Sequence, residues 1–135
     1  MTNGNIQSAR LTPARFVLLM LWGVVLWGAG VAILRWTASL GALSGMGQII
    51  VYALTIIGTV PLIPISVRLG GLPRSASLTA VAVPSMTALL IDGVVIGYLP
   101  WVYSADPVTA RACAGALLWA VGVALALGFA MARRD

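Results

Sequence analysis

The sequence predicts an all-α protein: a bundle of four transmembrane helices in a single membrane domain, residues 1–135, with both termini on the cytoplasmic side. Three observations lead to this prediction. Hydrophobic residues make up 61% of the 135 residues and charged residues only 8%, whereas soluble proteins carry roughly 25% charged residues. The apolar residues gather in four segments, each near the ~20 residues that cross a bilayer. The arginines are divided unequally between the two sides. A soluble enzyme and a disulfide scaffold are thereby excluded.

The first apolar segment covers residues 16–34 and is expected to be retained as a helix. Its apolar run is longer than the roughly 7–15 residues of a signal-peptide core, and it contains Trp22 and Trp27. The other predicted helices cover residues 49–67, 78–99 and 112–132. Proline removes a backbone donor and tends to kink a helix. Interruptions are therefore expected at three prolines of the second and third helices: Pro61, Pro64 and Pro84.

Turn and capping signals mark the connections between the helices. Residues 69–73 read Leu-Gly-Gly-Leu-Pro, which is typical of a tight turn, and Ser75 or Ser77 is available to cap the third helix. Asp106 followed by Pro107 predicts the N-cap and the first residue of the fourth helix. Aromatic residues favour the membrane interface. An interfacial belt is therefore expected at three aromatic residues near the loops: Trp36, Trp101 and Tyr103.

The arginines predict the orientation. Six of the eight lie in the N-terminal segment, in the second loop and at the C-terminus, whereas Arg35 and Arg111 lie in the opposite loops. The arginine-rich side of a membrane protein is usually cytoplasmic. We therefore predict a multi-pass membrane protein with both termini in the cytoplasm, N-in and C-in, surrounded by the lipid bilayer. The net charge of +5 is interpreted as this orientation signal rather than as a nucleic-acid site, because the arginines are not clustered.

Residue types that carry catalysis or bind metals are scarce. The chain has no histidine, and Cys113 is its single cysteine. Imidazole ligation and histidine base catalysis are therefore impossible, and the chain cannot form a clustered thiolate site. No nucleophile–base pair, metal cluster or phosphate-binding loop is visible. We expect no catalytic residue, no cofactor and no metal, and we do not expect an enzyme.

One acidic residue, Asp92, lies inside a predicted transmembrane helix, about 5 Å from its midpoint at ~1.5 Å per residue. An acid in the bilayer normally faces the bundle interior and has polar partners. A polar stripe on the second helix places Thr55 at the depth of Asp92 and Tyr52 one turn beyond it, and Ser85 shares the Asp92 face. These four residues form the candidate intramembrane polar site, in a seam between the second and third helices.

Two interpretations of Asp92 are open. In the functional one, Asp92 is a protonatable site or a carboxylate that binds a cation. In the structural one, it is held by Tyr52, Thr55 or Arg35. The threonines and serines are interpreted mainly as links between helices, each worth about 0.6 kcal/mol, because hydroxyls commonly serve that purpose in membrane bundles.

Small residues provide a packing signal. Gly93 and Gly97 form a Gly-x-x-x-Gly step, which lets two helix backbones approach closely. The step suits contact inside one bundle or between subunits. A homo-oligomer or a larger membrane complex is therefore the expected form of the protein.

Three segments of the second half carry a resemblance to other proteins. They read Val83-Pro-Ser-Met-Thr-Ala-Leu-Leu-Ile-Asp92, then Tyr98-Leu-Pro-Trp-Val-Tyr103, then Leu117-Leu-Trp119. In this pattern the chain resembles a small bacterial four-helix integral membrane family of unknown function, over residues 80–130. The resemblance implies a protein of the bacterial cytoplasmic membrane and supplies no reaction, substrate or site residue.

Two functions from different classes follow from these features. The first is a small membrane protein that transports a small solute or ion, with Asp92 at its centre. The alternative is an accessory or assembly subunit that packs against a larger membrane protein complex. Flux that depends on Asp92 would favour the first, and purification in a fixed ratio with another protein would favour the second.

Overall fold

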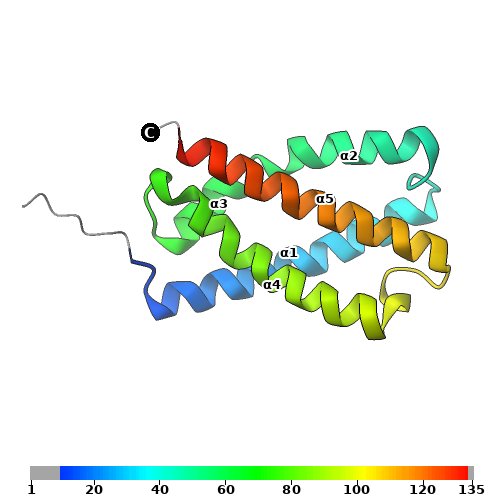
Figure 1. Cartoon of the computed structure of the whole chain (residues 1–135), viewed down its shortest axis with the longest axis horizontal. Helices are drawn as coiled ribbons and strands as arrows, with labels where there is room; N and C mark the ends of the chain where they lie inside the picture. Colours follow the sequence, from blue (N-terminus) through cyan, green and yellow to red (C-terminus); the bar gives the residue numbers. More distant parts are fainter. Residues whose placement is uncertain (1–9, 134–135) are drawn as a thin grey trace, which may run out of the picture.

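The computed structural model describes residues 10–133, and within them the chain is all-α. It contains four helical stretches that are long and apolar enough to cross a membrane (Figure 1). The chain is therefore a multi-pass membrane protein with four candidate spans. The elements in chain order are α1 (Pro13–Ser39), α2 (Gly45–Thr59), α3 (Leu62–Gly70), the 3-10 turn η1 (Arg74–Ala76), α4 (Ser77–Tyr98), the 3-10 turn η2 (Pro100–Val102) and α5 (Pro107–Ala132).

The first helix extends beyond its predicted bounds at both ends. It begins at Pro13 rather than at residue 16 and ends at Ser39 rather than at residue 34. Thr12 caps its start, because the hydroxyl oxygen accepts a hydrogen bond from the Arg15 N–H at 3.3 Å. Capping and backbone hydrogen bonds, rather than the end of the apolar run, therefore set the length of α1.

The cap predicted at the start of α5 is confirmed, whereas the one predicted at the start of α4 is not. α5 begins at Pro107, five residues before the predicted bound, and the Asp106 carboxylate accepts a hydrogen bond from the Thr109 N–H at 2.8 Å. The predicted serine cap of the third span is wrong, because no side chain caps α4. Ser77 is already helical, and its hydroxyl donates to the carbonyl of Arg74.

The second span is broken at Pro61. The helix α2 ends at Thr59 and α3 begins at Leu62, because Pro61 lacks the N–H that would continue the helical hydrogen bonds. Pro64 lies in the first turn of α3, where a missing donor is tolerated. The predicted interruption at Pro84 is wrong, since α4 continues through it.

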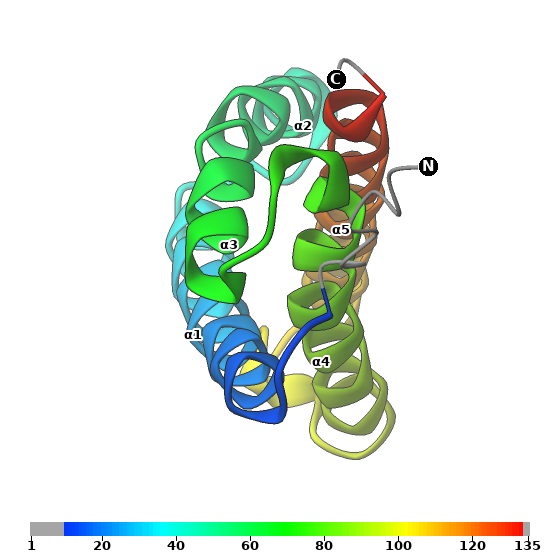
Figure 2. The ribbon, with the colours of Figure 1, turned by 90° about the vertical axis from the view of Figure 1, so that its left-hand side faces the viewer.

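The central helix of the bundle is α4, which packs mainly against α1 and α5. The short helix α3 packs against α4 and α1, whereas α2 packs against α5. Figure 1 shows α2 running beside α5, and Figure 2 shows the bundle from its end, with α1 and α3 on one side and α4 and α5 on the other. The predicted seam between the second and third spans is therefore wrong for α2: the second span meets the third through α3.

Glycines allow α4 to lie close to both neighbours. A Cβ atom at Gly23 of α1 would lie 2.6 Å from the carbonyl oxygen of Pro84 and 3.0 Å from the Cβ of Thr87. On α5, a Cβ at Gly128 would lie 3.4 Å from the Cβ of Val81. Backbones can approach this closely only where side chains are absent or small. The crossing of α1 and α4 at Gly23 is the tighter of the two contacts.

The predicted Gly-x-x-x-Gly step does not pack inside the bundle. Gly93 and Gly97 are exposed, and no heavy atom lies within 4 Å of a Cβ built at either position. The same outer surface carries many large apolar side chains, as helices in contact with lipid do. Exposed examples from three helices are Ile57, Leu90 and Leu118.

Candidate functional site

Asp92 is buried on α4, and its side chain is only 5% exposed. Its carboxylate oxygen Oδ1 accepts a hydrogen bond from the indole Nε1 of Trp27 at 2.7 Å and a second one from the hydroxyl of Tyr103. Two donors on one oxygen hold the carboxylate in a fixed position. The expected partners of Asp92 are therefore wrong, because neither Tyr52, Thr55 nor Arg35 donates to it.

The two real partners reach Asp92 through separate features of the fold. Trp27 lies one helical turn beyond Gly23, on the face of α1 that crosses α4, so the close crossing brings its indole to the carboxylate. Tyr103 follows the turn η2, which folds back after α4 ends at Tyr98. The hydrogen bonds of Trp27 and Tyr103 to Asp92 thus depend on Gly23 and on the turn η2.

Tyr103 was predicted to lie in the interfacial belt, and this prediction is wrong. Trp36 and Trp101 are exposed as expected, whereas Tyr103 is 1% exposed. Burial, followed by the hydrogen bond to Asp92, raises the pKa of Tyr103 far above its ordinary value of 10.0. The phenol therefore keeps its proton at neutral pH and acts as a donor to the carboxylate.

Arg35 holds the segment that carries Tyr103. Its guanidinium Nη1 donates to the backbone carbonyl of Val102 at 2.7 Å. Val102 immediately precedes Tyr103, so the bond ties α1 to the segment that carries the phenol. Arg35 thus acts on the loop, and among the described residues no hydrogen bond or ion pair joins it to Asp92.

Tyr52 and Thr55 belong to other contacts. The Tyr52 ring stacks on Trp119 of α5, with 5.3 Å between the ring centroids, and the Trp119 indole donates to the Tyr52 carbonyl at 3.1 Å. These contacts join α2 to α5. Thr55 donates to the carbonyl of Val51 within its own helix, at 2.8 Å. Of the three residues predicted to share a site with Asp92, only Ser85 lies on the same face of α4 and lines the same cavity.

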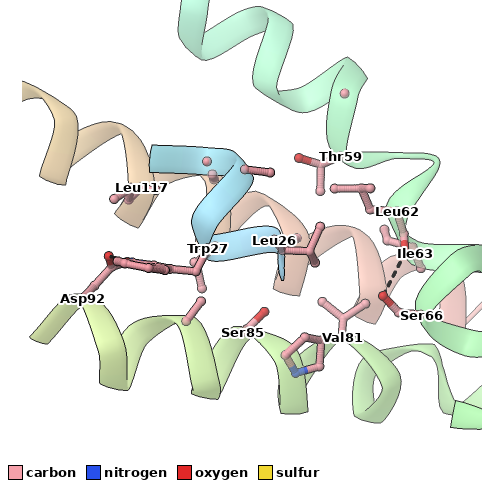
Figure 3. Close-up of a pocket in the computed structure, with 18 of the residues that line it drawn as sticks. Leu26, Trp27, Thr59, Leu62, Ile63, Ser66, Val81, Ser85, Asp92 and Leu117 are labelled. Carbon is pink, nitrogen blue, oxygen red and sulfur yellow. Dashed lines mark hydrogen bonds between the residues drawn. The ribbon is translucent and has the colours of Figure 1, made fainter. Parts of the chain in front are cut away.

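This cavity has a volume of about 390 Å³. It is lined by residues within 26–33 of α1, 58–59 of α2, 62–66 of α3, 81–92 of α4 and 117–124 of α5. Figure 3 shows Asp92 beside Trp27 at one end, with Thr59 and Ser66 toward the other. Most of the lining is apolar, as in pockets that bind small organic molecules.

The polar groups of the cavity differ in whether they are already hydrogen-bonded. The Thr59 hydroxyl donates to the carbonyl of Thr55 at 2.6 Å, and the Ser66 hydroxyl both donates to Leu62 and accepts from Trp22. Ser85 is only 8% exposed, yet its hydroxyl has no hydrogen-bond partner among residues 10–133. Figure 3 shows this hydroxyl pointing from α4 into the cavity.

One oxygen of the Asp92 carboxylate likewise lacks a hydrogen-bond partner among the described residues. Both protein donors bind Oδ1, and within the described part of the chain no group donates to Oδ2. A carboxylate accepts on both oxygens. Asp92 therefore has a free acceptor and Ser85 a free donor and acceptor, two helical turns or about 10 Å apart.

The exposed residues of its lining indicate that the cavity opens sideways between α1 and α2. Three of its lining residues are exposed on the outer surface: Ala29 and Ile33 on α1 and Gly58 on α2. The packing explains this opening, because α2 lies against α5 rather than against α1. In a membrane, the opening faces the lipid chains.

The site offers little for metal chemistry. Among the described residues, no three side chains of histidine, cysteine, aspartate or glutamate gather where they could hold a metal ion. What the arrangement can do is bind an apolar molecule and form hydrogen bonds with a polar group on it.

Sequence reasoning missed Trp27 and Tyr103, although one signal could have found the first. A buried indole N–H needs an acceptor, and Asp92 is the only acid within the predicted spans. Tyr103 carried no such signal, because its position beside Pro100 and Trp101 is equally typical of an interface.

Comparison of the chain with family models, with curated proteins and with solved structures finds no match.

Proposed function

We propose that this protein binds a small, largely apolar solute or ion inside the membrane and transports it, with Asp92 as the polar anchor. One observation supports this most directly: a buried carboxylate with a free oxygen lies at the end of an open apolar cavity. Polar groups are expensive within a membrane and usually mark a pathway when they line a cavity. A purely structural acid needs no cavity beside it.

The depth of the cavity supports transport. On α4 the lining runs from Val81 to Asp92, about 16 Å along the axis at ~1.5 Å per residue. This stretch includes the middle of α4 (Ser77–Tyr98), so the cavity lies across the centre of a hydrocarbon layer roughly 30 Å thick. Substrate sites of membrane transporters commonly lie at this depth.

The broken second span provides the moving part. Transport requires that the site open to each side in turn. Because α2 and α3 are separated at Pro61, α2 can tilt with respect to α3 while α3 stays packed on α1 and α4. A tilt of α2 changes the width of the opening beside Gly58.

We also propose that both termini face the cytoplasm of a bacterial cell and that the protein acts as a homo-oligomer. The unequal arginines support the orientation, and reporter fusions at each terminus and in the loop before α5 test it. The exposed Gly93 and Gly97 face supports contact with a further helix. The same face fits the alternative, an accessory subunit of a larger complex, for which co-purification with another protein in a fixed ratio is the expected result.

We propose no enzymatic reaction at this site. A nucleophile and its base lie within about 2.6–3.2 Å of each other. Ser85 and Asp92 are separated by two helical turns, about 10 Å, so Asp92 cannot activate the serine directly.

Flux into vesicles tests the transport proposal. Radiolabelled octylguanidinium is a suitable probe, because its N–H groups can donate to Asp92 and its guanidinium stays charged at neutral pH, which keeps it from crossing a bare bilayer quickly. We expect the purified protein to accelerate its uptake and Asp92→Asn to reduce that uptake at least tenfold. Asp106→Asn is the matched control, since Asp106 only caps α5.

Folding of each variant is checked by circular dichroism before flux is measured. Where Asp92→Asn does not fold, Ala88→Leu takes its place, because Ala88 lines the cavity one turn from Asp92. Uptake by a folded Asp92→Asn protein at the wild-type rate would contradict the proposal, and so would uptake no faster than in protein-free vesicles.

A further inference from the structure

We propose that the ligand enters this cavity from the lipid phase, between α1 and α2, and that it is an amphipathic molecule with a hydrogen-bond-donating, preferably cationic, head and an apolar tail. The inference rests on the proposed function only in that both use the same cavity. It names the chemical class of the ligand and the route by which it arrives.

The head group follows from the atoms left free around Asp92. Trp27 and Tyr103 both donate to Oδ1, so a ligand meets Oδ2, an acceptor without a donor among the described residues. In a hydrocarbon environment an acceptor without a donor is costly. An ammonium group satisfies it best, because hydrogen bonds between charged partners are about twice as strong as neutral ones. An anionic head would face the carboxylate and is disfavoured.

The tail follows from the remaining lining. Between Asp92 and Ser85 the wall of the cavity includes Ala88 on α4 and Leu117 on α5, which suit an apolar chain. The volume of about 390 Å³ corresponds to roughly a dozen groups of the size of a water molecule, at ~30 Å³ each. An octyl chain with a small head fits within this space. A second polar group on the tail would meet the free Ser85 hydroxyl.

The route follows from the position of the opening. Ala29, Ile33 and Gly58 line the cavity and are also exposed, so the opening lies on the lipid-facing surface. No heavy atom lies within 4 Å of a Cβ built at Gly58. A Cβ can therefore be added at Gly58 without a clash, and a longer side chain extending from it would narrow the opening and leave Asp92 untouched.

Three eight-carbon probes that differ in their head group test this preference: octylamine, octanol and octanoate. Equilibrium binding of each is measured on the full-length protein in lipid nanodiscs, with empty nanodiscs as the blank for partition into lipid. We expect saturable binding of octylamine at least tenfold tighter than that of octanoate, with octanol between them. In Asp92→Asn, which keeps an acceptor oxygen for Trp27 and Tyr103, the affinities for octylamine and octanol should come within about twofold of each other.

A matched pair of variants tests the route. Gly58→Leu adds a side chain at the opening, and Gly122→Leu adds the same side chain to an exposed position of α5 outside the cavity, which also has no heavy atom within 4 Å. Association of octylamine is followed by stopped-flow tryptophan fluorescence, since Trp27 lines the cavity. We expect Gly58→Leu to slow association at least fivefold and Gly122→Leu to leave it unchanged.

The outcomes separate this inference from the transport proposal. Equal affinity for the three heads in the wild-type protein, or equal association rates in the two leucine variants, overturns the inference even if flux is observed. Selective binding through the opening without flux supports the inference and overturns transport. The head comparison uses wild-type protein, so it remains decisive where Asp92→Asn does not fold.

Discussion

The crossing of α1 and α4 at Gly23 predicts that a single methyl group weakens the whole bundle. In Gly23→Ala the new Cβ would lie 2.6 Å from the carbonyl oxygen of Pro84 and 2.8 Å from its Cα. Both atoms belong to the backbone, so no side-chain rotation relieves the contact. The two helices must move apart, and Trp27, one turn away, must move with α1.

The magnitude follows from two opposing effects. Extra volume in a well-packed interior costs about 1–3 kcal/mol, and contacts with backbone place Gly23→Ala at the upper end of this range. Alanine in place of glycine in a helix gains up to about 1 kcal/mol. We therefore expect a net loss of about 2 kcal/mol. Gly28→Ala, on the same helix with no heavy atom within 4 Å of its Cβ position, should gain up to about 1 kcal/mol.

Reversible unfolding in mixed micelles, followed by circular dichroism, measures both changes. Tryptophan fluorescence of the folded state should shift in Gly23→Ala and not in Gly28→Ala, because only the former displaces Trp27 from Asp92. The reasoning is refuted if the two alanine variants are equally stable, since the structure then misplaces the closest contact between α1 and α4.

Two further predictions concern the loop between α4 and α5. Tyr103→Phe should lower the free energy of unfolding by about 1.5–3 kcal/mol, because the Asp92 carboxylate loses a charge-assisted hydrogen bond. Tyr98→Phe is the control, since Tyr98 is 77% exposed. Equal stability of the two variants would contradict the prediction. Hydrogen bonds from the side chain and then the backbone of Thr109 lower the pKa of Asp106 below its ordinary value of 3.8. The ionised Asp106 cap therefore stabilises α5 fully above pH 3.8. This stabilisation is lost as the pH falls through the lowered pKa of Asp106. Thermal unfolding between about pH 6 and pH 2 should therefore show an acid-induced loss that is smaller in Asp106→Asn, whose amide oxygen caps the helix without titrating; identical acid profiles would rule this contribution out.

The arrangement around Asp92 explains why a membrane protein with so few polar residues keeps an acid in a helix. Trp27 and Tyr103 place two donors on one carboxylate oxygen, which secures the contact of α1 with α4 and of α4 with the loop that follows it. The second oxygen has no donor among the described residues and is the atom that the proposed ligand would bind. The structural and functional interpretations of Asp92 are therefore compatible, because each uses a different atom.

Local features of the sequence predicted the four spans and several of their boundaries, although the interruption at Pro84 and the serine cap of the third span were wrong. Length and hydropathy located four spans, Pro61 located the break in the second, and Asp106 with Pro107 located the start of α5. These features act within a few residues, through the missing N–H of proline or the capping of free backbone donors. The ends of α1 were less predictable, because lipid-facing apolar length and helix length need not coincide.

The neighbours of each helix were decided only by the tertiary structure. Periodicity placed Tyr52, Thr55 and Asp92 on polar faces, yet α2 packs on α5 through the stacking of Tyr52 on Trp119. Gly93 and Gly97 looked like the close contact and face outward, while Gly23 forms it. In a bilayer almost every face of a helix is apolar, so hydropathy cannot specify which faces meet. The helix neighbours are specified instead by the fit of glycine against backbone and by the pairing of buried donors with one carboxylate.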